Sequence, residues 1–215
     1  MLHLIKPNNY NLYRKDLDNM YRLRHRVFCT KLNWDVNGHD GMEKDQYDEK
    51  NAYYLIYKDE QGIIVGCVRF IEMIHDCMFD GPFKHVLSNV SEFKRRGYWE
   101  TSRFAVDTGS TGYYKSYGQR NVTKMLLAGL IQFGLNSRKV ECYLALSYLA
   151  FKKLNKKYGL FLYDIHQHLI NGKEIFIWAF PPMSYSFDKL TYEQNDYIRS
   201  KVICDFSSVS SVCKI

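Results

Sequence analysis

The sequence predicts an α/β fold built around a mixed β-sheet, on three observations. From about residue 98 onward, strand and helix patterns follow each other in the order strand, helix, strand, helix, strand, strand. Before them, 52–58 and 63–73 are rich in β-branched and aromatic residues and flank a polar turn, which predicts a hairpin. With 215 residues, 46% of them hydrophobic, the chain can bury a substantial core. We predict one domain over 1–215, with a polar tail from 181.

The N-terminal elements are predicted to be a short strand at 2–5 and an amphipathic helix at 15–30. Arg24 lies in the middle of the apolar stripe of this helix, between Tyr21 and Phe28. Its head could snorkel to the surface, but other basic residues already occupy the polar face of the helix. We therefore expect Arg24 to point inward, where a guanidinium needs a carboxylate partner.

The segment 33–51 is polar, turn-rich and acidic in a chain whose net charge is +7. Loops of this length without secondary structure are uncommon and often serve as lids or binding loops. Most of its charges are expected to be solvated, but Asp45 and Asp48 are available to pair with an inward arginine. Trp34 is expected to cover another group, because so large a ring is unusual in a polar loop.

The strand predicted at 98–107 carries Glu100, Ser102 and Arg103 among aromatic and β-branched residues. Strict alternation places Glu100 and Ser102 on one face and Arg103 on the other. An edge strand with a wet face and a pocket crossing the middle of the sheet explain this stretch equally well. Arg69, within the apolar run of the preceding strand, is a further charge that needs a partner.

The remaining elements complete the strand and helix order. They are predicted as a helix at 119–136, a strand at 140–146, a helix at 148–158, strands at 160–165 and 174–180, and a short helix near 192–202. The helix at 148–158 gathers four lysines within two turns, which are Lys152, Lys153, Lys156 and Lys157. An ordinary solvated face explains any one of them nearly as well as a docking surface does.

Composition argues against several functional classes. The six cysteines show neither a CxxC pair nor a zinc-ligand spacing, so we predict free thiols, no metal site and a cytoplasmic protein. Cys67 lies in an apolar run and is expected to be a packed thiol, not a nucleophile. No apolar stretch is long enough for a signal peptide or a membrane span. The pI of about 9.0 favours an acidic partner, but no recognition motif indicates nucleic acid.

Several of these segments together resemble the acyl-homoserine-lactone synthases, the LuxI-type autoinducer synthases of bacterial quorum sensing. The resemblance covers roughly residues 1–180. Its motifs match the family in identity, order and approximate spacing: RHRVF at 24–28, Trp34, DQYD at 45–48, GCVRF at 66–70, Phe83 and WETSRF at 99–104.

The resemblance implies an N-acetyltransferase-like fold, in which a twisted mixed sheet opens into a V-shaped cleft flanked by helices. It implies an acyltransferase that joins an acyl chain from acyl carrier protein, or sometimes from acyl-coenzyme A, to the amine of S-adenosylmethionine (SAM). The product closes to a homoserine lactone and methylthioadenosine (MTA) leaves. SAM is then a substrate, and neither a cofactor nor an obligate protein partner is expected.

The resemblance also implies roles for individual residues. Glu100 is expected to be the general base for the amine, with Arg69 beside it in the catalytic site. The expected SAM pocket comprises Arg24, Phe28, Trp34, Asp45, Asp48 and Arg103, and the last of these is expected to brace the acidic loop. The expected acyl-chain pocket comprises Ser102, Leu144 and Ser147. The four lysines of the helix at 148–158 are expected to dock the acidic acyl carrier protein.

The sequence also bears on which acyl group is transferred and on which carrier delivers it. Leu144 stands at the position where the family members that make 3-oxo products carry a threonine. Leucine offers no hydrogen-bond donor to a 3-oxo oxygen, so a product without a 3-oxo group is expected. A shift of the alignment by one residue would place Tyr143 at this position instead.

The rival function is an acyl-coenzyme A-dependent N-acyltransferase of the same fold. Such enzymes have two small residues in a pyrophosphate loop, and the corresponding stretch KSYGQR at 115–120 has one glycine, which disfavours coenzyme A as the main donor.

Overall fold

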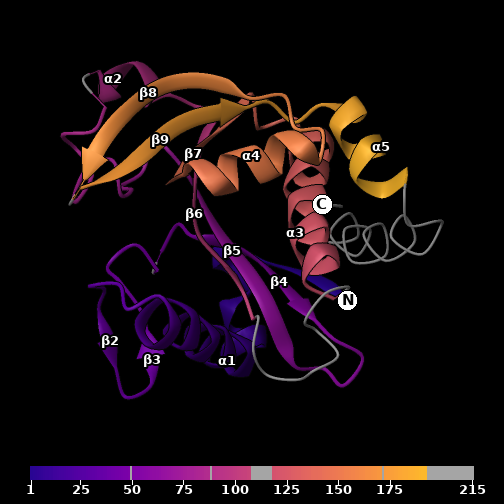
Figure 1. Cartoon of the computed structure of the whole chain (residues 1–215). Helices are drawn as coiled ribbons and strands as arrows, with labels where there is room; N and C mark the ends of the chain where they lie inside the picture. The colour runs from indigo at the N-terminus through magenta and orange to yellow at the C-terminus, as the bar shows by residue number, and fades with distance from the viewer. Residues whose placement is uncertain (49, 88, 108–117, 171, 193–215) are drawn as a thin grey trace.

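The computed structural model describes residues 1–192 except 49, 88, 108–117 and 171 (Figure 1). At its centre is a seven-stranded sheet in the order β1-β4-β5-β6-β7-β9-β8. The strands are β1 (Leu2–Ile5), β4 (Tyr53–Lys58), β5 (Ile64–Glu72), β6 (Tyr98–Val106), β7 (Cys142–Tyr148), β8 (Tyr163–Ile170) and β9 (Lys173–Phe180). The main helices are α1 (Arg14–Arg24), α3 (Gly118–Ser137), α4 (Leu149–Lys157) and α5 (Ser184–Tyr192).

The predicted mixed sheet and the predicted element order are confirmed. The strand pairs are antiparallel except β6 and β7, which are parallel because α3 connects them as a crossover. β6 is the fourth of the seven strands, so the edge-strand explanation of its polar residues is wrong. The β6–β7 ladder joins 98–101 to 142–145 and does not continue along the rest of these two fully described strands. The sheet is therefore held together at this point by a short ladder.

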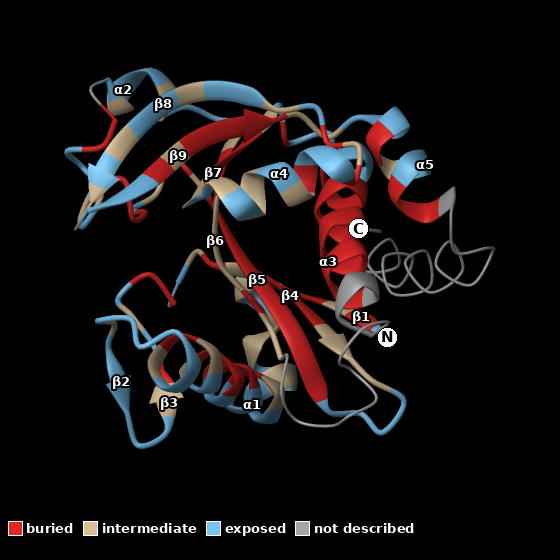
Figure 2. Ribbon diagram, in the orientation of Figure 1, coloured by how far each residue is buried: buried red, intermediate tan, exposed pale blue. Residues whose placement is uncertain are grey.

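The two faces of the sheet are covered differently. α3, α4 and α5 cover one face, which we call the α3 face, and α1 covers the other, the α1 face, as the positions of α1 and α3 on either side of β4 and β5 show (Figure 1). Most of α3 is buried, whereas α1 has an exposed side (Figure 2). Gly129 lets α3 approach the sheet closely, because a Cβ there would lie 2.5 Å from the side chain of Leu2.

The segment after α1 is more structured than the sequence indicated. α1 continues as a π-helix, η2 (His25–Lys31), and the acidic segment folds into a small hairpin of β2 (Gly38–His39) and β3 (Met42–Glu43). A short 3-10 helix, η1 (Pro7–Tyr13), precedes α1, and a single turn, α2 (Val90–Phe93), lies between β5 and β6.

Some boundaries differ from the predictions. β8 begins at Tyr163 and not at 160, because it is an edge strand whose largely exposed, polar side chains give a weak apolar pattern. The last described helix is α5, at 184–192, where Leu190 is buried on the α3 face; the helix expected near 192–202 lies almost entirely outside the described residues. The first half of the stretch at 115–120 also lies outside the described residues, and its second half begins α3. Among the described residues, no helix is long and apolar enough to cross a membrane.

Candidate functional site

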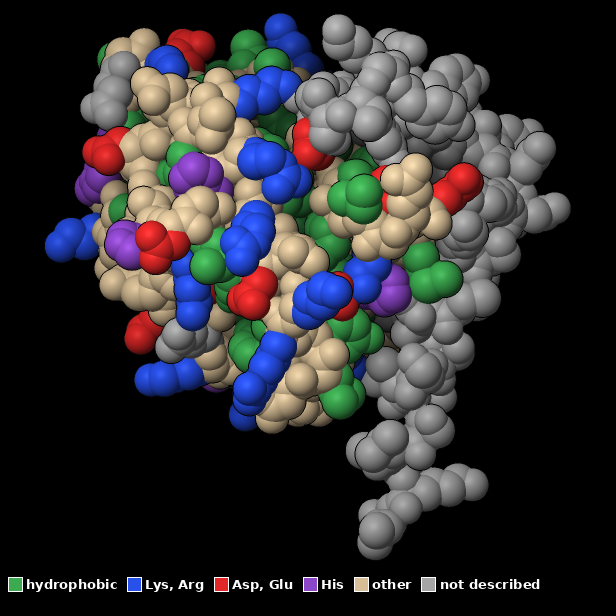
Figure 3. All heavy atoms as spheres, turned by 90° about the horizontal axis from the view of Figure 1, so that it is seen from below, with side chains coloured by type: hydrophobic (Ala, Val, Ile, Leu, Met, Phe, Trp, Pro, Cys, Tyr) green, Lys and Arg blue, Asp and Glu red, His purple; other side chains and the backbone are tan. Residues whose placement is uncertain are grey.

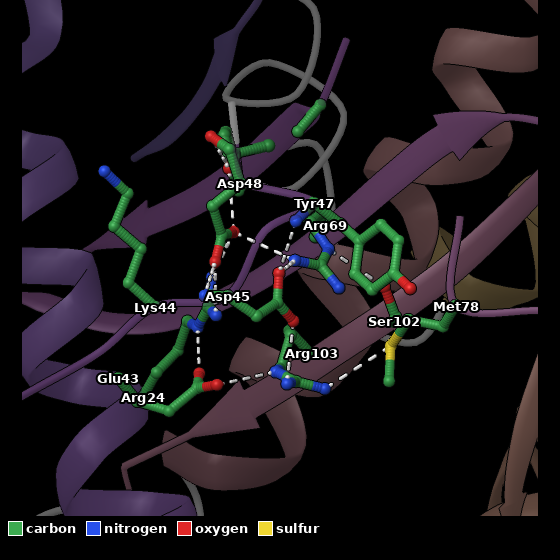
Figure 4. A network of polar contacts seen from close by, with 12 residues as sticks. Arg24, Glu43, Lys44, Asp45, Tyr47, Asp48, Arg69, Met78, Ser102 and Arg103 are labelled. Atoms are coloured by element: carbon green, nitrogen blue, oxygen red, sulfur yellow. Dashed lines mark hydrogen bonds and ion pairs between the residues drawn. The ribbon is translucent and has the colours of Figure 1, made fainter. Parts of the chain in front are cut away.

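A network of three arginines and three carboxylates lies on the α1 face of the sheet (Figure 4). Its members come from α1, the acidic segment, β5 and β6, and they are Arg24, Glu43, Asp45, Asp48, Arg69 and Arg103. Three cations and three anions balance formally, which is the condition under which charges can be held away from water.

Arg24 points inward from α1, as predicted. Its Nε donates to Glu43 Oε2 at 2.6 Å, and Nη1 and Nη2 donate to the two oxygens of Asp48 at 2.6 and 2.8 Å. Burial alone would lower the pKa of Arg24, but Asp48 and Glu43 outweigh it and raise that pKa. Burial would likewise raise the pKa of Asp48, but Arg24 and Arg69 hold it well below its usual range. Both groups are therefore charged at neutral pH.

Arg69 links the network to β6. Its Nη1 lies 2.5 Å from Asp45 Oδ1 and 3.0 Å from Asp48 Oδ1, and its Nε donates to Ser102 Oγ at 3.1 Å. The remaining nitrogen, Nη2, is buried and has no hydrogen-bond partner among the described residues. A buried donor left open in this way is suited to an anionic group of a ligand.

Arg103 corrects a prediction. It was expected to face away from Glu100 and Ser102, yet it lies on the α1 face, where its Nε is 3.0 Å from Glu43 Oε1 and its Nη2 is 2.8 Å from Asp45 Oδ2. The cause is a β-bulge: the register between β5 and β6 shifts here, and Arg103 has a φ of 52°. One extra residue in a strand breaks the alternation of side chains. These ion pairs join Arg103 to the acidic segment, and its role of bracing that segment stays a prediction.

Glu43 is the network residue that sequence reasoning missed. It is fully buried and bridges Arg24 and Arg103 through its two oxygens. A charge count would have found it. Three inward arginines need more than the two aspartates at 45 and 48, and the acidic segment supplies a third carboxylate.

Glu100 lies beside this network on the α1 face of β6. It pairs across the ladder with Ile71 of β5 and is 2% exposed. One oxygen, Oε2, accepts a hydrogen bond of 2.7 Å from the backbone N–H of Met78. The other, Oε1, is buried without a hydrogen-bond partner among the described residues. An anchored carboxylate with one open oxygen can accept a proton from a bound ligand.

Aromatic rings adjoin the network. Phe28 and Trp34 stack with ring centroids 5.1 Å apart and 9° between their planes, so Trp34 covers another group, as predicted. The guanidinium of Arg103 lies 5.9 Å from the centre of the Phe28 ring. Cys67 is buried nearby, and burial raises the pKa of its thiol to about 12, which supports its prediction as a packed thiol.

The residues expected to line an acyl pocket do not all meet. Leu144 is fully buried, pairs with Glu100 across the β6–β7 ladder and lies on the α1 face. Ser147 is an odd number of residues further along β7 and lies on the α3 face, where Trp178 Nε1 donates to its hydroxyl at 2.8 Å. Ser102 lies on the α1 face and is bonded to Arg69. The structure therefore does not bring Ser147 together with the other two.

The four lysines of α4 do not all lie on one exposed surface. Lys153, Lys156 and Lys157 are exposed. Lys152 instead pairs with Asp164 and lies 4.9 Å from the ring centre of Phe176, so it does not belong to a free basic face. Basic side chains are not confined to α4, since the face seen from below in Figure 3 carries many, interspersed with acidic ones.

Comparisons with known proteins place the chain among related sequences and structures. The family model described as autoinducer synthase matches residues 8–189. The acyl-homoserine-lactone synthase of Agrobacterium fabrum is 34% identical over 155 residues, which are 72% of this chain and 73% of that protein. The enzyme of the same name from Vibrio anguillarum is 31% identical over 145 residues, or 67% of this chain and 74% of that protein.

Solved structures share the fold. The synthase LasI superposes with a TM-score of 0.76 at 24% identity, covering 88% of this chain and 93% of LasI. BjaI, described as a CoA-dependent acyl-homoserine lactone synthase and solved with SAM and isopentyl-CoA, gives 0.76 at 21% identity, covering 90% of this chain and 88% of BjaI. The match of the family model over most of the described residues and the two curated relatives show that the chain belongs to the autoinducer synthase family.

Proposed function

We propose that the chain is an acyl-homoserine-lactone synthase that acylates the amine of SAM and then closes the lactone, releasing MTA. The observation that carries this proposal is the pair of open, buried groups on the α1 face: the Oε1 carboxylate oxygen of Glu100 and the Nη2 donor of Arg69. SAM brings an ammonium and a carboxylate on one carbon, so it offers a proton donor and an anion to these two groups. The names of the curated relatives and the SAM bound to BjaI support the same substrate.

In this proposal each step is balanced by a residue or a leaving group. Glu100 Oε1, directly or through a water, takes a proton from the ammonium of SAM, because a protonated amine cannot attack a thioester. The amine then bonds to the thioester carbon and the donor thiol leaves. The substrate carboxylate next attacks its own γ-carbon, and the C–S bond to the sulfonium breaks to give MTA. The arginine and carboxylate network holds the site in place and does not enter any covalent step.

The proposed acyl donor is acyl carrier protein, in the cytoplasm. The exposed lysines Lys153, Lys156 and Lys157 support an acidic protein donor, since complementary charge steers association. The unpaired thiols of Cys29, Cys67, Cys77 and Cys142 suit a reducing compartment. Acyl-coenzyme A is the second candidate donor, because BjaI and MesI are both described as CoA-dependent.

The proposed product lacks a 3-oxo group. Leu144 lies opposite Glu100 in the ladder and offers no hydrogen-bond donor, and desolvating an unpaired carbonyl costs roughly 1–3 kcal/mol. Competition between 3-oxo and unsubstituted donors of equal chain length should favour the unsubstituted one by roughly 5- to 150-fold. Leu144→Thr should move selectivity toward the 3-oxo donor. A preference of the unmodified chain for the 3-oxo donor would contradict the assignment.

The test of function is direct. The purified protein is mixed with SAM and with acyl carrier protein or coenzyme A thioesters of four to fourteen carbons, and lactone and MTA are measured by mass spectrometry. We expect both products in equal amounts with at least one donor. If no donor of either type yields lactone, the proposed function is wrong.

A further inference from the structure

The end of β7 places an aromatic ring at the point where β6 and β7 stop pairing. The ladder ends at Thr101 and Ala145, and β7 continues for three residues to Tyr148. In sheets with parallel strands, ligands bind in the crevice beyond the carboxyl ends of the strands. Tyr148 is the last residue of β7, and it alternates with Leu144 and Leu146, which lie on the α1 face. Its side chain is therefore on the side of the sheet that carries the charged network.

Tyr148 meets the aromatic residues of the other half of the molecule. Its ring centroid lies 6.1 Å from that of Trp34, with 62° between the two planes. Trp34 stacks nearly parallel on Phe28, at 9°, so Phe28 covers one face of the Trp34 ring. The planes of the Trp34 and Tyr148 rings therefore meet at a steep angle, and we call this pair of rings the aromatic corner.

The exposure of the aromatic corner argues against a packing role. Trp34 is 37% exposed and Tyr148 is 36% exposed, whereas Trp99 and Trp178 are 2% and 1% exposed. The ammonium of Lys173 lies 5.9 Å from the centre of the Tyr148 ring, within the range of a cation–π contact. A pair of partly exposed rings beside a charged site is suited to a flat ligand group.

We propose that Tyr148 is a binding residue for the adenine ring of the adenosyl group, which SAM and MTA share, and that adenine enters the aromatic corner against Trp34. The inference deepens the proposed function and rests on it. The methionyl end of SAM would then point toward Arg69 and Glu100, which lie on the same face of the sheet. Because the corner contains residues from both sides of the β6–β7 opening, adenine would join the two halves of the site.

Binding of MTA and SAM to the full chain tests this inference without requiring turnover. Trp34 is the exposed tryptophan of the three in the chain, so protection of fluorescence from acrylamide reports on the aromatic corner. Titration calorimetry gives Kd in parallel. The variants are Tyr148→Ala, Tyr148→Phe and the control Tyr185→Ala, whose exposed ring lies on α5.

Tyr148→Ala is expected to weaken the binding of both MTA and SAM by about 5- to 150-fold, since removing one stacking ring typically has an effect of this size. Tyr148→Phe should stay within about twofold because it keeps the ring, and Tyr185→Ala should leave both Kd values unchanged. MTA should protect Trp34 from acrylamide in the unmodified chain.

Three results would overturn the inference. Unchanged Kd values in Tyr148→Ala would show that Tyr148 does not touch the ligand. Weaker SAM binding with normal MTA binding would place the ring against the sulfonium or the methionyl end, because MTA lacks both. A wild-type chain that binds neither ligand would overturn the proposed function as well, whereas failure confined to Tyr148→Ala leaves that function standing.

Discussion

The two faces of β5 and β6 differ sharply although their residues are neighbours in the sequence. On the α1 face, Arg69 and Glu100 belong to or adjoin a buried charged network. On the α3 face, Phe70 and Trp99, one residue away in each strand, pack ring to ring with centroids 5.7 Å apart. Tyr53 and Phe133 complete this aromatic cluster.

The difference separates stability from function. Burying aromatic rings is favourable in itself, so the α3 face can hold the sheet together. Burying charges is costly, and paired charges add little stability compared with apolar residues of similar volume. We therefore propose that the six charged side chains of the network serve ligand binding more than folding. Each of the following tests perturbs residues on one face of the sheet, or residues near it, and leaves the other face unchanged.

The largest effect is expected at Glu100. Glu100→Gln keeps the shape of the side chain but cannot take up the proton, so turnover should fall by about 10²–10⁴-fold. The melting temperature of the Glu100→Gln variant should stay close to that of the unmodified chain. Glu141→Gln, the same change at an exposed position, is the control. Near-normal turnover by Glu100→Gln would remove Glu100 from the role of base.

The next effect compares one residue from each face. Arg24→Ala leaves Glu43 and Asp48 buried without their shared partner and should lower the free energy of unfolding by about 3–5 kcal/mol. Phe70→Ala should lower it by a similar ~3–5 kcal/mol through a cavity. The two variants should differ in ligand binding, because only Arg24→Ala disturbs the charged network.

Urea unfolding and the Kd of MTA measure both quantities in each variant. Arg22→Ala, on the exposed side of α1, should change the free energy of unfolding by no more than about 0.5 kcal/mol. If Phe70→Ala weakened MTA binding as strongly as Arg24→Ala does, the two faces would not be separable in this way.

A smaller effect is expected from acid. The pKa of Asp48 is lower in the folded chain than its usual value of about 3.9. The contribution of Asp48 to stability is therefore complete above that usual value and is lost as pH falls toward the folded pKa. The free energy of unfolding should therefore decline below about pH 4. Asp48→Asn should be less stable at neutral pH and should show a shallower decline. Asp76→Asn, at an exposed site, should follow the unmodified chain.

The smallest effect lies outside both faces, on α4. Reversing Lys153, Lys156 and Lys157 to Glu should raise the KM for acyl carrier protein substrates several-fold at low salt, and the difference should shrink as salt screens the charges. SAM binding should not change. The same reversal on α1, at Arg14, Lys15 and Arg22, is the matched control. If α1 rather than α4 controlled the KM, the donor would dock on the other side of the molecule.

Local sequence determined much of this protein. The periodicity of apolar residues is a local property, so the hairpin of β4 and β5, the order from β6 to β9 and the inward direction of Arg24 could all be predicted. The need of a buried guanidinium for carboxylates pointed to Asp45 and Asp48. The family motifs pointed to the same residues.

Tertiary structure alone decided the rest, because it depends on partners that are distant in the sequence. The bulge that turns Arg103 toward Glu43 arises from the register between β5 and β6, and no pattern within β6 reveals it. Lys152 forms an ion pair with Asp164 of β8 and therefore does not belong to a free basic face. Tyr148 of β7 contacts Trp34 of the acidic segment, although the two residues are far apart in the sequence. The periodicity of apolar residues predicts which face of a helix or strand a side chain occupies. The residues that this side chain contacts depend on how strands that are far apart in the sequence pair with one another.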